Sequence, residues 1–232
     1  MQISKRLRAV ASMVSQGYRV ADIGTDHAYI PIYLIMEERC SSALAMDIGR
    51  GPLEKAEEHI RAYGLEEQIE IRLSDGLAEY RQGEADSIVI AGMGGALMTR
   101  ILSGGAEKCA GVKELILSPQ SELFLVREWL GENGWQIERE EMLREDGKYY
   151  TVMRAVRGTM PRQRPVEALY GKYLLEHRNE ALLEFLRQEK ESVYKIAKAL
   201  EGGCGEHIES RKKELADKLN GIKEALAYYE MQ

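Results

Sequence analysis

The fold of this chain is decided near its N-terminus by the stretch Val20-Ala21-Asp22-Ile23-Gly24-Thr25-Asp26-His27-Ala28. An apolar run ends there in an acidic residue and a glycine, and a helix-like segment follows. A second apolar run, residues 43–46, then ends in a lone carboxylate, Asp47. Gly24 lets the backbone come close to a ligand, and a carboxylate about 20 residues later can accept hydrogen bonds from two ribose hydroxyls. This order of residues indicates a nucleoside-cofactor site in a doubly wound α/β fold.

The length and composition of the chain fit one full α/β domain with a small appendage. Of the 232 residues, 44% are hydrophobic and 30% are charged, so we expect a packed core rather than disorder. The apolar runs are too short to span a bilayer, and residues 1–6 lack the apolar region of a signal peptide. We therefore expect a cytoplasmic protein without a membrane partner.

The cysteines and the charges exclude further classes of protein. Cys40, Cys109 and Cys204 lie far apart and form no Cys-x-x-Cys pair, which argues against a disulfide framework or a zinc site. We expect no metal. The net charge is −6, and from Thr159 onward basic and acidic residues are equal in number. A polyanion would therefore meet local basic patches rather than a generally positive protein.

Hydrophobic periodicity predicts alternating strands and helices over the first half of the chain. The predicted strands are residues 18–23, 43–46, 68–73, 86–90 and 114–117. The predicted helices are residues 3–16, 29–38, 51–63, 97–102 and 124–130. Gly17 and Gly64 are predicted to stop the first and third helices, and Pro52 to stand at the first position of the third.

The pattern changes after the fifth strand and its helix. Residues 135–143 and 149–156 resemble two strands joined across Glu145-Asp146-Gly147-Lys148, and Asp-Gly is a strong hairpin signal. Nicotinamide-binding Rossmann domains do not usually end in this way, whereas class I S-adenosylmethionine methyltransferases do. By that analogy we predict a class I methyltransferase, Rossmann-like doubly wound sheet that ends in an antiparallel hairpin.

A second domain is predicted beyond a break at residues 158–165, which gives domains of residues 1–158 and 159–232. Two long helical patterns follow the break, each with apolar residues spaced three, four or seven apart. Their apolar positions are Leu175, Leu182, Leu186, Val193, Ile196 and Leu200 in the first, and Leu215, Leu219, Ile222, Leu226 and Tyr229 in the second. Gly202-Gly203-Cys204-Gly205 stands between them, so we expect an antiparallel, coiled-coil-like helical hairpin.

Four motifs together resemble those of the bacterial tRNA (adenine-22-N1)-methyltransferases, the TrmK family. They are Ser4-Lys5-Arg6-Leu7, residues 21–31 (Ala-Asp-Ile-Gly-Thr-Asp-His-Ala-Tyr-Ile-Pro), Ala91-Gly92-Met93-Gly94-Gly95, and residues 145–150 (Glu-Asp-Gly-Lys-Tyr-Tyr). The resemblance covers essentially the whole chain and is specific only in combination. It implies S-adenosylmethionine as methyl donor and N1 of an adenine, at position 22 in the D-arm region of tRNA, as acceptor. Members often have glutamate where Asp47 stands, and the shorter side chain also suits a ribose diol.

Three predicted turns carry the residues expected to bind the cofactor. Asp22, Gly24 and Thr25 would hold its methionine end, near a helix N-terminus, or form an ordinary turn. Asp47, with Ile48 beside it, would bind the ribose, or cap the approach to a helix. Asp75 would accept a hydrogen bond from the adenine amino group and Gly76 would admit the ring; the alternative is a helix N-cap. The residues of these turns that are expected to bind the cofactor are therefore Asp22, Gly24, Thr25, Asp47, Ile48, Asp75 and Gly76.

The loop Ala91-Gly92-Met93-Gly94-Gly95 follows the predicted fourth strand, where methyltransferases line the transfer site. Enzymes that methylate the amino group of adenine typically place an (N/D/S)-P-P-(Y/F/W) motif there, and this chain has none. Its absence favours a ring nitrogen over N6. The glycines would let a flat base come close to the sulfonium; the alternative is a flexible glycine turn.

Asp26, His27 and Tyr29 are the candidates for direct chemistry. Adenine N1 already carries a lone pair, and the base becomes cationic as the methyl moves, so the Asp26 carboxylate would stabilise that charge. The alternative for Asp26 is a helix N-cap. His27 could donate to the cofactor carboxylate or to a phosphate, and Tyr29 could stack near the donor, while both could equally be packing residues. Much of the catalysis should come from in-line positioning.

Residues expected at the substrate lie at the same sheet edge and in two basic clusters. Pro119 and Gln120 end the fifth strand, where Gln120 could hydrogen-bond the base or simply be solvated. The expected phosphate contacts are Lys5, Arg6 and Arg8 on the first helix, and Arg154 and Arg157, with Arg162 and Arg164, at the domain junction. A third cluster, residues 211–213, is expected to be solvated. The C-terminal pair would contact tRNA or bind a protein partner.

Two rival functions stay open at this point. One is a small-molecule methyltransferase, which would not need the basic junction. The other is a non-catalytic module that holds the cofactor and binds a protein through its helical pair. The leading prediction is a monomeric, S-adenosylmethionine-dependent tRNA adenine N1-methyltransferase.

Overall fold

The computed structural model describes residues 1–202 and 205–230, which form two compact units. The first unit comprises Met1–Glu141 and Tyr150–Pro161. The second comprises Met142–Tyr149 and the described residues from Arg162 onward. The tip of the predicted hairpin therefore belongs with the C-terminal helices, and the sequence-predicted domain boundary after Gly158 stays a prediction.

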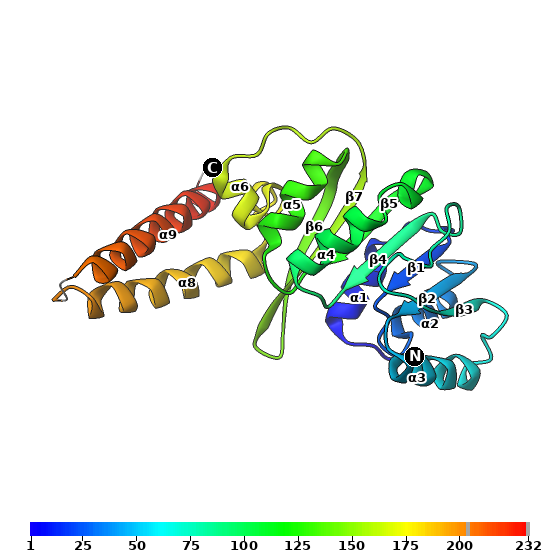
Figure 1. Cartoon of the computed structure of the whole chain (residues 1–232). Helices are drawn as coiled ribbons and strands as arrows, with labels where there is room; N and C mark the ends of the chain where they lie inside the picture. The colour runs from blue at the N-terminus through cyan, green and yellow to red at the C-terminus, as the bar shows by residue number, and fades with distance from the viewer. Residues whose placement is uncertain (203–204, 231–232) are drawn as a thin grey trace. The chain divides into compact units, whose positions relative to one another are not determined.

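The first unit is built on a seven-stranded sheet with the order β3-β2-β1-β4-β5-β7-β6 (Figure 1). Its strands are β1 (Val20–Ile23), β2 (Ala43–Asp47), β3 (Ile69–Leu73), β4 (Ser87–Ala91), β5 (Glu114–Ser118), β6 (Trp135–Glu145) and β7 (Lys148–Arg157). The first five are parallel, and β7 runs antiparallel to β5. This sheet confirms the predicted doubly wound fold with an antiparallel end.

The helices of the first unit cover both faces of this sheet. They are α1 (Lys5–Met13), α2 (Tyr29–Met36), α3 (Arg50–Ala62), α4 (Gly95–Gly104), the 3-10 turn η1 (Lys108–Gly111) and α5 (Leu123–Glu132). Alternate residues of β1, β4 and β5 pack with α4 and α5 into one buried cluster that includes Ile23, Ile90 and Leu117. Because both faces are covered, β1, β4 and β5 are apolar along nearly their whole length.

The strand order places the topological switch point of the sheet between β1 and β4. Val20 of β1 lies between Ala43 of β2 on one side and Ser87 of β4 on the other. The chain leaves β1 toward one edge of the sheet and returns at β4 toward the other, so the loops after these strands diverge. In open α/β sheets, ligands bind in the crevice that such divergent loops leave at the carboxyl ends of the strands.

Several element boundaries differ from the sequence predictions. The first helix ends at Met13, because Val14 takes extended backbone angles (φ −67°, ψ 131°), and Gly17 lies in the turn beyond it. The third helix begins at Arg50 with Gly49 as its N-cap, so Pro52 is not its first residue. Gly64, with φ +67°, does end that helix as predicted, since its amide and that of the next residue bond to carbonyls of the last turn.

The hairpin turn has the predicted chemistry. Asp146 and Gly147 both take positive φ angles, 49° and 77°, as the two-residue turns that match the twist of a β-ribbon require. Antiparallel β7 then pairs with β5, with Glu114 opposite Val156 and Leu117 opposite Met153. The last two strands thus extend the parallel sheet without another crossover helix.

The second unit is helical, with α6 (Pro165–Tyr170), α7 (Lys172–Glu176), α8 (Glu180–Ala199) and α9 (Glu206–Glu230). The pair α8 and α9 run back alongside each other, as predicted (Figure 1). Their shared core contains most of the predicted apolar positions. Gly203 and Cys204, in the predicted connection, lie outside the described residues.

The prediction for the first of the two long helices is wrong in two respects, the residue at which the helix starts and the burial of one apolar position. Leu175 lies in the separate helix α7, because Arg178 takes φ +50° and the Asn179 side chain caps α8 by accepting from the Leu182 amide at 2.9 Å. Ile196 is 45% exposed rather than part of the core. None of the helices in residues 1–202 and 205–230 has the length and apolar character needed to cross a membrane.

Candidate functional site

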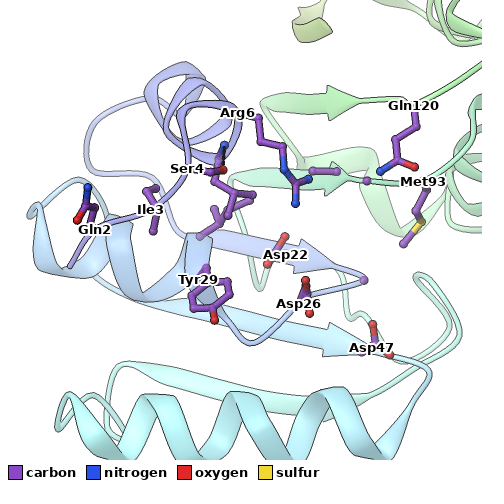
Figure 2. Close-up of a pocket in the computed structure, with 15 residues that line it drawn as sticks. Gln2, Ile3, Ser4, Arg6, Asp22, Asp26, Tyr29, Asp47, Met93 and Gln120 are labelled. Atoms are coloured by element: carbon purple, nitrogen blue, oxygen red, sulfur yellow. Dashed lines mark hydrogen bonds between the residues drawn. The ribbon is translucent and has the colours of Figure 1, made fainter. Parts of the chain in front are cut away.

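A cavity of about 600 Å³ lies in the first unit, at the carboxyl ends of β1, β2 and β4 (Figure 2). Its size suits a nucleoside cofactor together with part of a substrate. The residues it takes from the predicted loops are Asp22, Gly24, Asp26, Asp47, Ala91, Gly92, Met93 and Gln120. Loops that lie far apart in the sequence therefore meet in one site, as the strand order requires.

Asp22, the last polar residue of β1, is the buried carboxylate of the cavity. The residue is 4% exposed. Burial raises the pKa of Asp22 to about 7, the nearby carboxylates Asp47 and Asp26 add to the rise, and Thr25 opposes it. The Thr25 hydroxyl is itself buried and, although near Asp22, makes no hydrogen bond of normal geometry with a described residue. A cationic ligand in the cavity would therefore favour the ionised form of Asp22.

Gly24 turns the chain away from β1 with φ +75°, a conformation that favours glycine. Its amide and that of Thr25 both donate to the carbonyl oxygen of Met46, at 2.8 and 2.9 Å. These two amides are thus engaged within the protein, and the turn offers a ligand the remaining surface of Gly24. A Cβ at Gly24 would lie 2.0 Å from the methyl carbon of Met93, so the loop after β4 closely approaches this glycine.

Asp47 ends β2 and projects into the same cavity (Figure 2). One of its carboxylate oxygens accepts a hydrogen bond from the Gly49 amide at 2.7 Å, which fixes the orientation of the side chain. Its second oxygen has no hydrogen-bond partner among the described residues and can accept from a ligand hydroxyl. Asp47 does not cap α3, whose N-cap is Gly49.

Ile48, Asp75 and Gly76 lie outside the residues that line the cavity. Ile48 is 68% exposed, and Asp75 is also exposed. At Gly76, φ is +54° and a Cβ would lie 2.9 Å from the side chain of Ile101 on α4, so packing already accounts for this glycine. Asp75 is followed directly by a turn over residues 76–79 rather than by a helix, so it is not the helix cap considered above. The cofactor contacts predicted for these three residues stay predictions.

Backbone hydrogen bonds join the glycine-rich loop after β4 to the end of β5 and the loop that follows it. Gly92 donates to the Ser118 carbonyl at 3.1 Å, Gln120 to the Met93 carbonyl at 2.9 Å, and Gly95 to the Ser121 carbonyl at 3.0 Å. At Gly95 a Cβ would lie 2.5 Å from the Glu122 carbonyl oxygen. The Glu122 carboxylate also accepts from the Ala96 amide at the start of α4.

These hydrogen bonds fix which residues of the two loops line the cavity. The loop residues that line it are Ala91, Gly92, Met93 and Gln120. Gly94 is instead the N-cap of α4 and Gly95 its first residue. Pro119 is buried and does not line the cavity. The loop is therefore a bonded platform beside the cavity rather than a flexible turn.

The side chains of Asp26 and His27 are in contact at the cavity edge, with 3.1 Å between Asp26 Oδ1 and His27 Nε2. The Asp26 side chain is 77% exposed and His27 is 26% exposed. The N-cap of α2 is Ala28, in a left-handed conformation and without a side-chain cap. Asp26 is therefore no helix cap, and its carboxylate remains accessible to a ligand.

Tyr29 lines the cavity and belongs to a stack of three aromatic rings. Its ring lies 5.3 Å from the ring of His27, nearly parallel at 13°, and 5.3 Å from the ring of His59. His59 lies on α3, was not expected from the sequence, and bonds through Nδ1 to the His27 carbonyl oxygen at 3.1 Å.

The N-terminal segment forms a wall of the cavity that sequence reasoning found only in part. Besides the predicted Arg6, residues Gln2, Ile3 and Ser4 line it (Figure 2). Leu7 and Ile30 also line it. The residue in the sequence that could have indicated this wall is Ser4, a residue type that favours helix N-caps. Its hydroxyl accepts a hydrogen bond from the Leu7 amide at 3.3 Å and caps α1 beside the cavity. The Arg6 guanidinium lies 5.6 Å from the centre of the Tyr150 ring.

The other predicted phosphate-binding residues differ in what they already contact. Lys5 and Arg8 are exposed on α1, and Arg8 bonds to the Ile3 carbonyl. Arg154 pairs with the buried Glu114 at 2.9 Å and also with Glu138.

Arg157 is likewise engaged within the protein. It bonds to the Cys109 carbonyl at 2.6 Å and lies 3.8 Å over the Trp135 ring. RNA binding by Arg154 or Arg157 would have to compete with these intramolecular contacts. Within the described part of the chain, no group of three or more His, Cys, Asp or Glu side chains could hold a metal ion.

Comparison with known proteins agrees with this geometry. The sequence profile of a family described as "Methyltransferase domain" matches residues 3–153. The Bacillus subtilis tRNA (adenine(22)-N(1))-methyltransferase is 36% identical over 232 residues, which cover 97% of this chain and 98% of the relative.

Solved structures of similar proteins match over almost the whole chain. Streptococcus pneumoniae Sp1610, a putative tRNA (m1A22) methyltransferase in complex with S-adenosyl-L-methionine, has a TM-score of 0.87 at 35% identity, covering 97% of this chain and 100% of its own. M. capricolum TrmK in complex with S-adenosyl-homocysteine has a TM-score of 0.86 at 26% identity, covering 98% of this chain and 99% of its own.

Proposed function

The chain belongs to the family of bacterial tRNA (adenine-22-N1)-methyltransferases, and we propose that it transfers a methyl group from S-adenosylmethionine to N1 of adenine 22 in tRNA. The observation that carries this proposal is the grouping of Asp22, Asp26 and Asp47 beside Gly24 in one cavity at the switch point of the sheet. When bound there, S-adenosylmethionine supplies a methyl group activated by a positively charged sulfur.

The residues of the cavity fit this donor. Asp47 has an oriented carboxylate with one oxygen able to accept from ribose hydroxyls. Gly24 lacks a side chain, which lets the Met93 methyl group pack against the β1 turn at the cavity. Asp22 supplies a buried carboxylate for a cation. Three carboxylates in one cavity lower the free energy of a ligand that carries ammonium and sulfonium charges.

Asp26 is the proposed catalytic residue. Its carboxylate is accessible, faces the cavity and is held by His27. N1 of adenine needs no deprotonation before attack, and the ring gains a positive charge as the N–C bond forms. A carboxylate fixed near that charge stabilises the transition state more than the neutral ground state.

The remaining side chains around Asp26 are proposed to position the base. Met93 and Gln120 lie on the bonded platform after β4 and β5, where Gln120 has an amide that can bond to a base edge. Tyr29 offers a ring for stacking. Arg6 and its exposed neighbours Lys5 and Arg8 are proposed to bind tRNA phosphates at the same side of the first unit.

The test is incubation of the purified chain with unmodified tRNA and S-adenosylmethionine carrying a deuterated methyl group, followed by mass spectrometry of the nucleosides. We expect deuterated N1-methyladenosine from tRNA with adenine at position 22 and none from a matched tRNA with guanine there. N6-methyladenosine, or equal labelling of both tRNAs, would contradict the proposal.

The same assay separates the two rival functions. A small-molecule methyltransferase would methylate free adenosine or another small acceptor and leave tRNA unlabelled. A non-catalytic module would bind S-adenosylmethionine in calorimetry but form no methylated nucleoside. The family membership and the position of Asp26 at the cavity both favour the tRNA enzyme over these rivals.

A further inference from the structure

The segment from Asp26 to Tyr29 carries the proposed catalytic carboxylate in an unusual backbone conformation. His27 and Ala28 both take left-handed angles, with φ of 57° and 55°. Two successive residues with a Cβ rarely adopt this conformation, because each Cβ crowds its own backbone. The helix that follows gives no compensation through a cap, since Ala28 makes no side-chain cap bond. Contacts from elsewhere in the fold must therefore hold the turn in place.

His59 supplies such contacts from α3, at a distance of 32 residues along the chain. Its Nδ1 lies 3.1 Å from the His27 carbonyl oxygen. A carbonyl oxygen can only accept, so Nδ1 of His59 carries the proton and donates it. The ring of His59 also lies 5.4 Å from the ring of His27 at 27°, and 5.3 Å from that of Tyr29. One side chain thus bonds the strained peptide and packs on both flanking rings.

His27 links the contact made by His59 to Asp26 at the cavity. The carbonyl that His59 holds belongs to the peptide between His27 and Ala28, so the contact restrains the backbone that carries the His27 side chain. His27 Nε2 in turn lies 3.1 Å from Asp26 Oδ1. Asp26 is otherwise largely exposed, so little else restricts its rotamer.

We propose that His59 is a positioning residue that fixes the left-handed turn at His27 and Ala28 and thereby aims Asp26 at the substrate. The proposal rests on the proposed function, because it assigns His59 to the same methyl-transfer site. His59 itself is not among the residues that line the cavity, and it acts only through the turn.

The test compares two substitutions that separate the hydrogen bond from the ring. His59→Leu keeps a bulky side chain without a donor, whereas His59→Asn keeps a donor at the position equivalent to Nδ1 without the ring. Glu58→Leu, at an exposed neighbour on the same helix, is the matched control. Steady-state methylation of unmodified tRNA gives kcat and KM, and the thermal midpoint of each variant verifies folding.

We expect His59→Leu to lower kcat by about tenfold or more, because a misplacement of about 1 Å at a catalytic site can cost about a hundredfold in rate. The KM for S-adenosylmethionine should stay within about threefold, since Asp47 and Gly24 are untouched. His59→Asn should recover most of the lost kcat. If kcat of His59→Leu equals that of the wild type, or if His59→Asn is as impaired as His59→Leu, the positioning role of the hydrogen bond is wrong.

A measurement independent of activity keeps this proposal separate from the function itself. The carbon-13 chemical shift of the Ala28 Cα reports its left-handed conformation in an NMR spectrum of the whole chain. We expect His59→Leu to shift this resonance toward the random-coil value and His59→Asn to leave it in place. An unchanged Ala28 resonance in His59→Leu would overturn the proposal. A wild-type chain that makes no N1-methyladenosine would overturn the proposed function, and the NMR comparison would still decide the role of His59.

Discussion

Replacing Asp22 by asparagine should remove a pH-dependent loss of stability. The pKa of Asp22 is raised from 3.8 to about 7, and burial is the main cause. Between these pH values the folded protein keeps the Asp22 proton while the unfolded chain has lost it. The folded state therefore binds more protons, and the stability of the wild type falls as the pH rises through this window. Above about pH 7 the buried carboxylate is ionised in the folded state and the full loss is present.

The size of the effect follows from the shift. A difference of about three pKa units corresponds to about 4 kcal/mol at about 1.4 kcal/mol for each unit. About 2 kcal/mol of this should fall between pH 5.5 and pH 8.5, because the wild type titrates only up to about pH 7 there. Asparagine has a similar shape and never ionises, so the Asp22→Asn chain should escape this part of the pH dependence.

The assay is urea unfolding of the ligand-free wild type and Asp22→Asn chains at pH 5.5, 7.0 and 8.5. Other titrating groups are common to both proteins, so the difference between the two free energies of unfolding isolates Asp22. We expect this difference to move in favour of Asp22→Asn by about 2 kcal/mol from the lowest to the highest pH. Parallel curves over the whole range would refute the reasoning, since they would mean that Asp22 is ionised in the folded protein throughout.

Three further predictions concern the cavity. Asp47→Ala should weaken S-adenosylmethionine binding by about tenfold or more in calorimetry, through loss of a charge-assisted hydrogen bond, while Glu58→Ala binds normally; unaltered affinity of Asp47→Ala would reject the ribose assignment. Asp26→Asn should lower kcat by about a hundredfold with an affinity for the donor that changes by less than about threefold, and near wild-type turnover would exclude the charge-stabilising role. Gly24→Ala should lower stability by about 1–2 kcal/mol or more through its φ of +75° and also lose donor binding, because the new Cβ would lie 2.0 Å from the Met93 methyl carbon. The double variant Gly24→Ala/Met93→Ala should recover only the stability that Gly24→Ala loses through the contact with the Met93 methyl. If urea titration shows full recovery of stability in this double variant, the backbone at residue 24 is not strained by alanine.

The parts of the fold that depend on local sequence could be predicted. Each strand of the parallel sheet is a short apolar run followed by a polar or glycine-rich turn, and the βα order alone brings those turns to one edge. For this reason Asp22, Gly24, Asp26, Asp47, Met93 and Gln120 meet in one cavity as expected. The Asp-Gly turn likewise specifies the hairpin, since few other residues tolerate positive φ at both positions.

The parts that depend on contacts between distant segments could not be predicted. His59 and the N-terminal wall reach the site through packing that no local pattern reveals. The charges of Arg154 and Arg157 are visible in the sequence, but their intramolecular partners Glu114 and Cys109 are not. Apolar spacing also continues across Asn179, so the sequence pattern does not show the break that its side-chain cap and Arg178 impose there.

The central claim is that the cavity beside Gly24 holds the methyl donor, and a crystal structure of the chain with S-adenosylhomocysteine tests it most directly. We expect the ribose hydroxyls within hydrogen-bond distance of Asp47, the amino-acid end near Asp22 and Gly24, and the sulfur open toward Asp26 and Gln120. A ligand bound at another surface, with Asp47 free of it, would contradict the account.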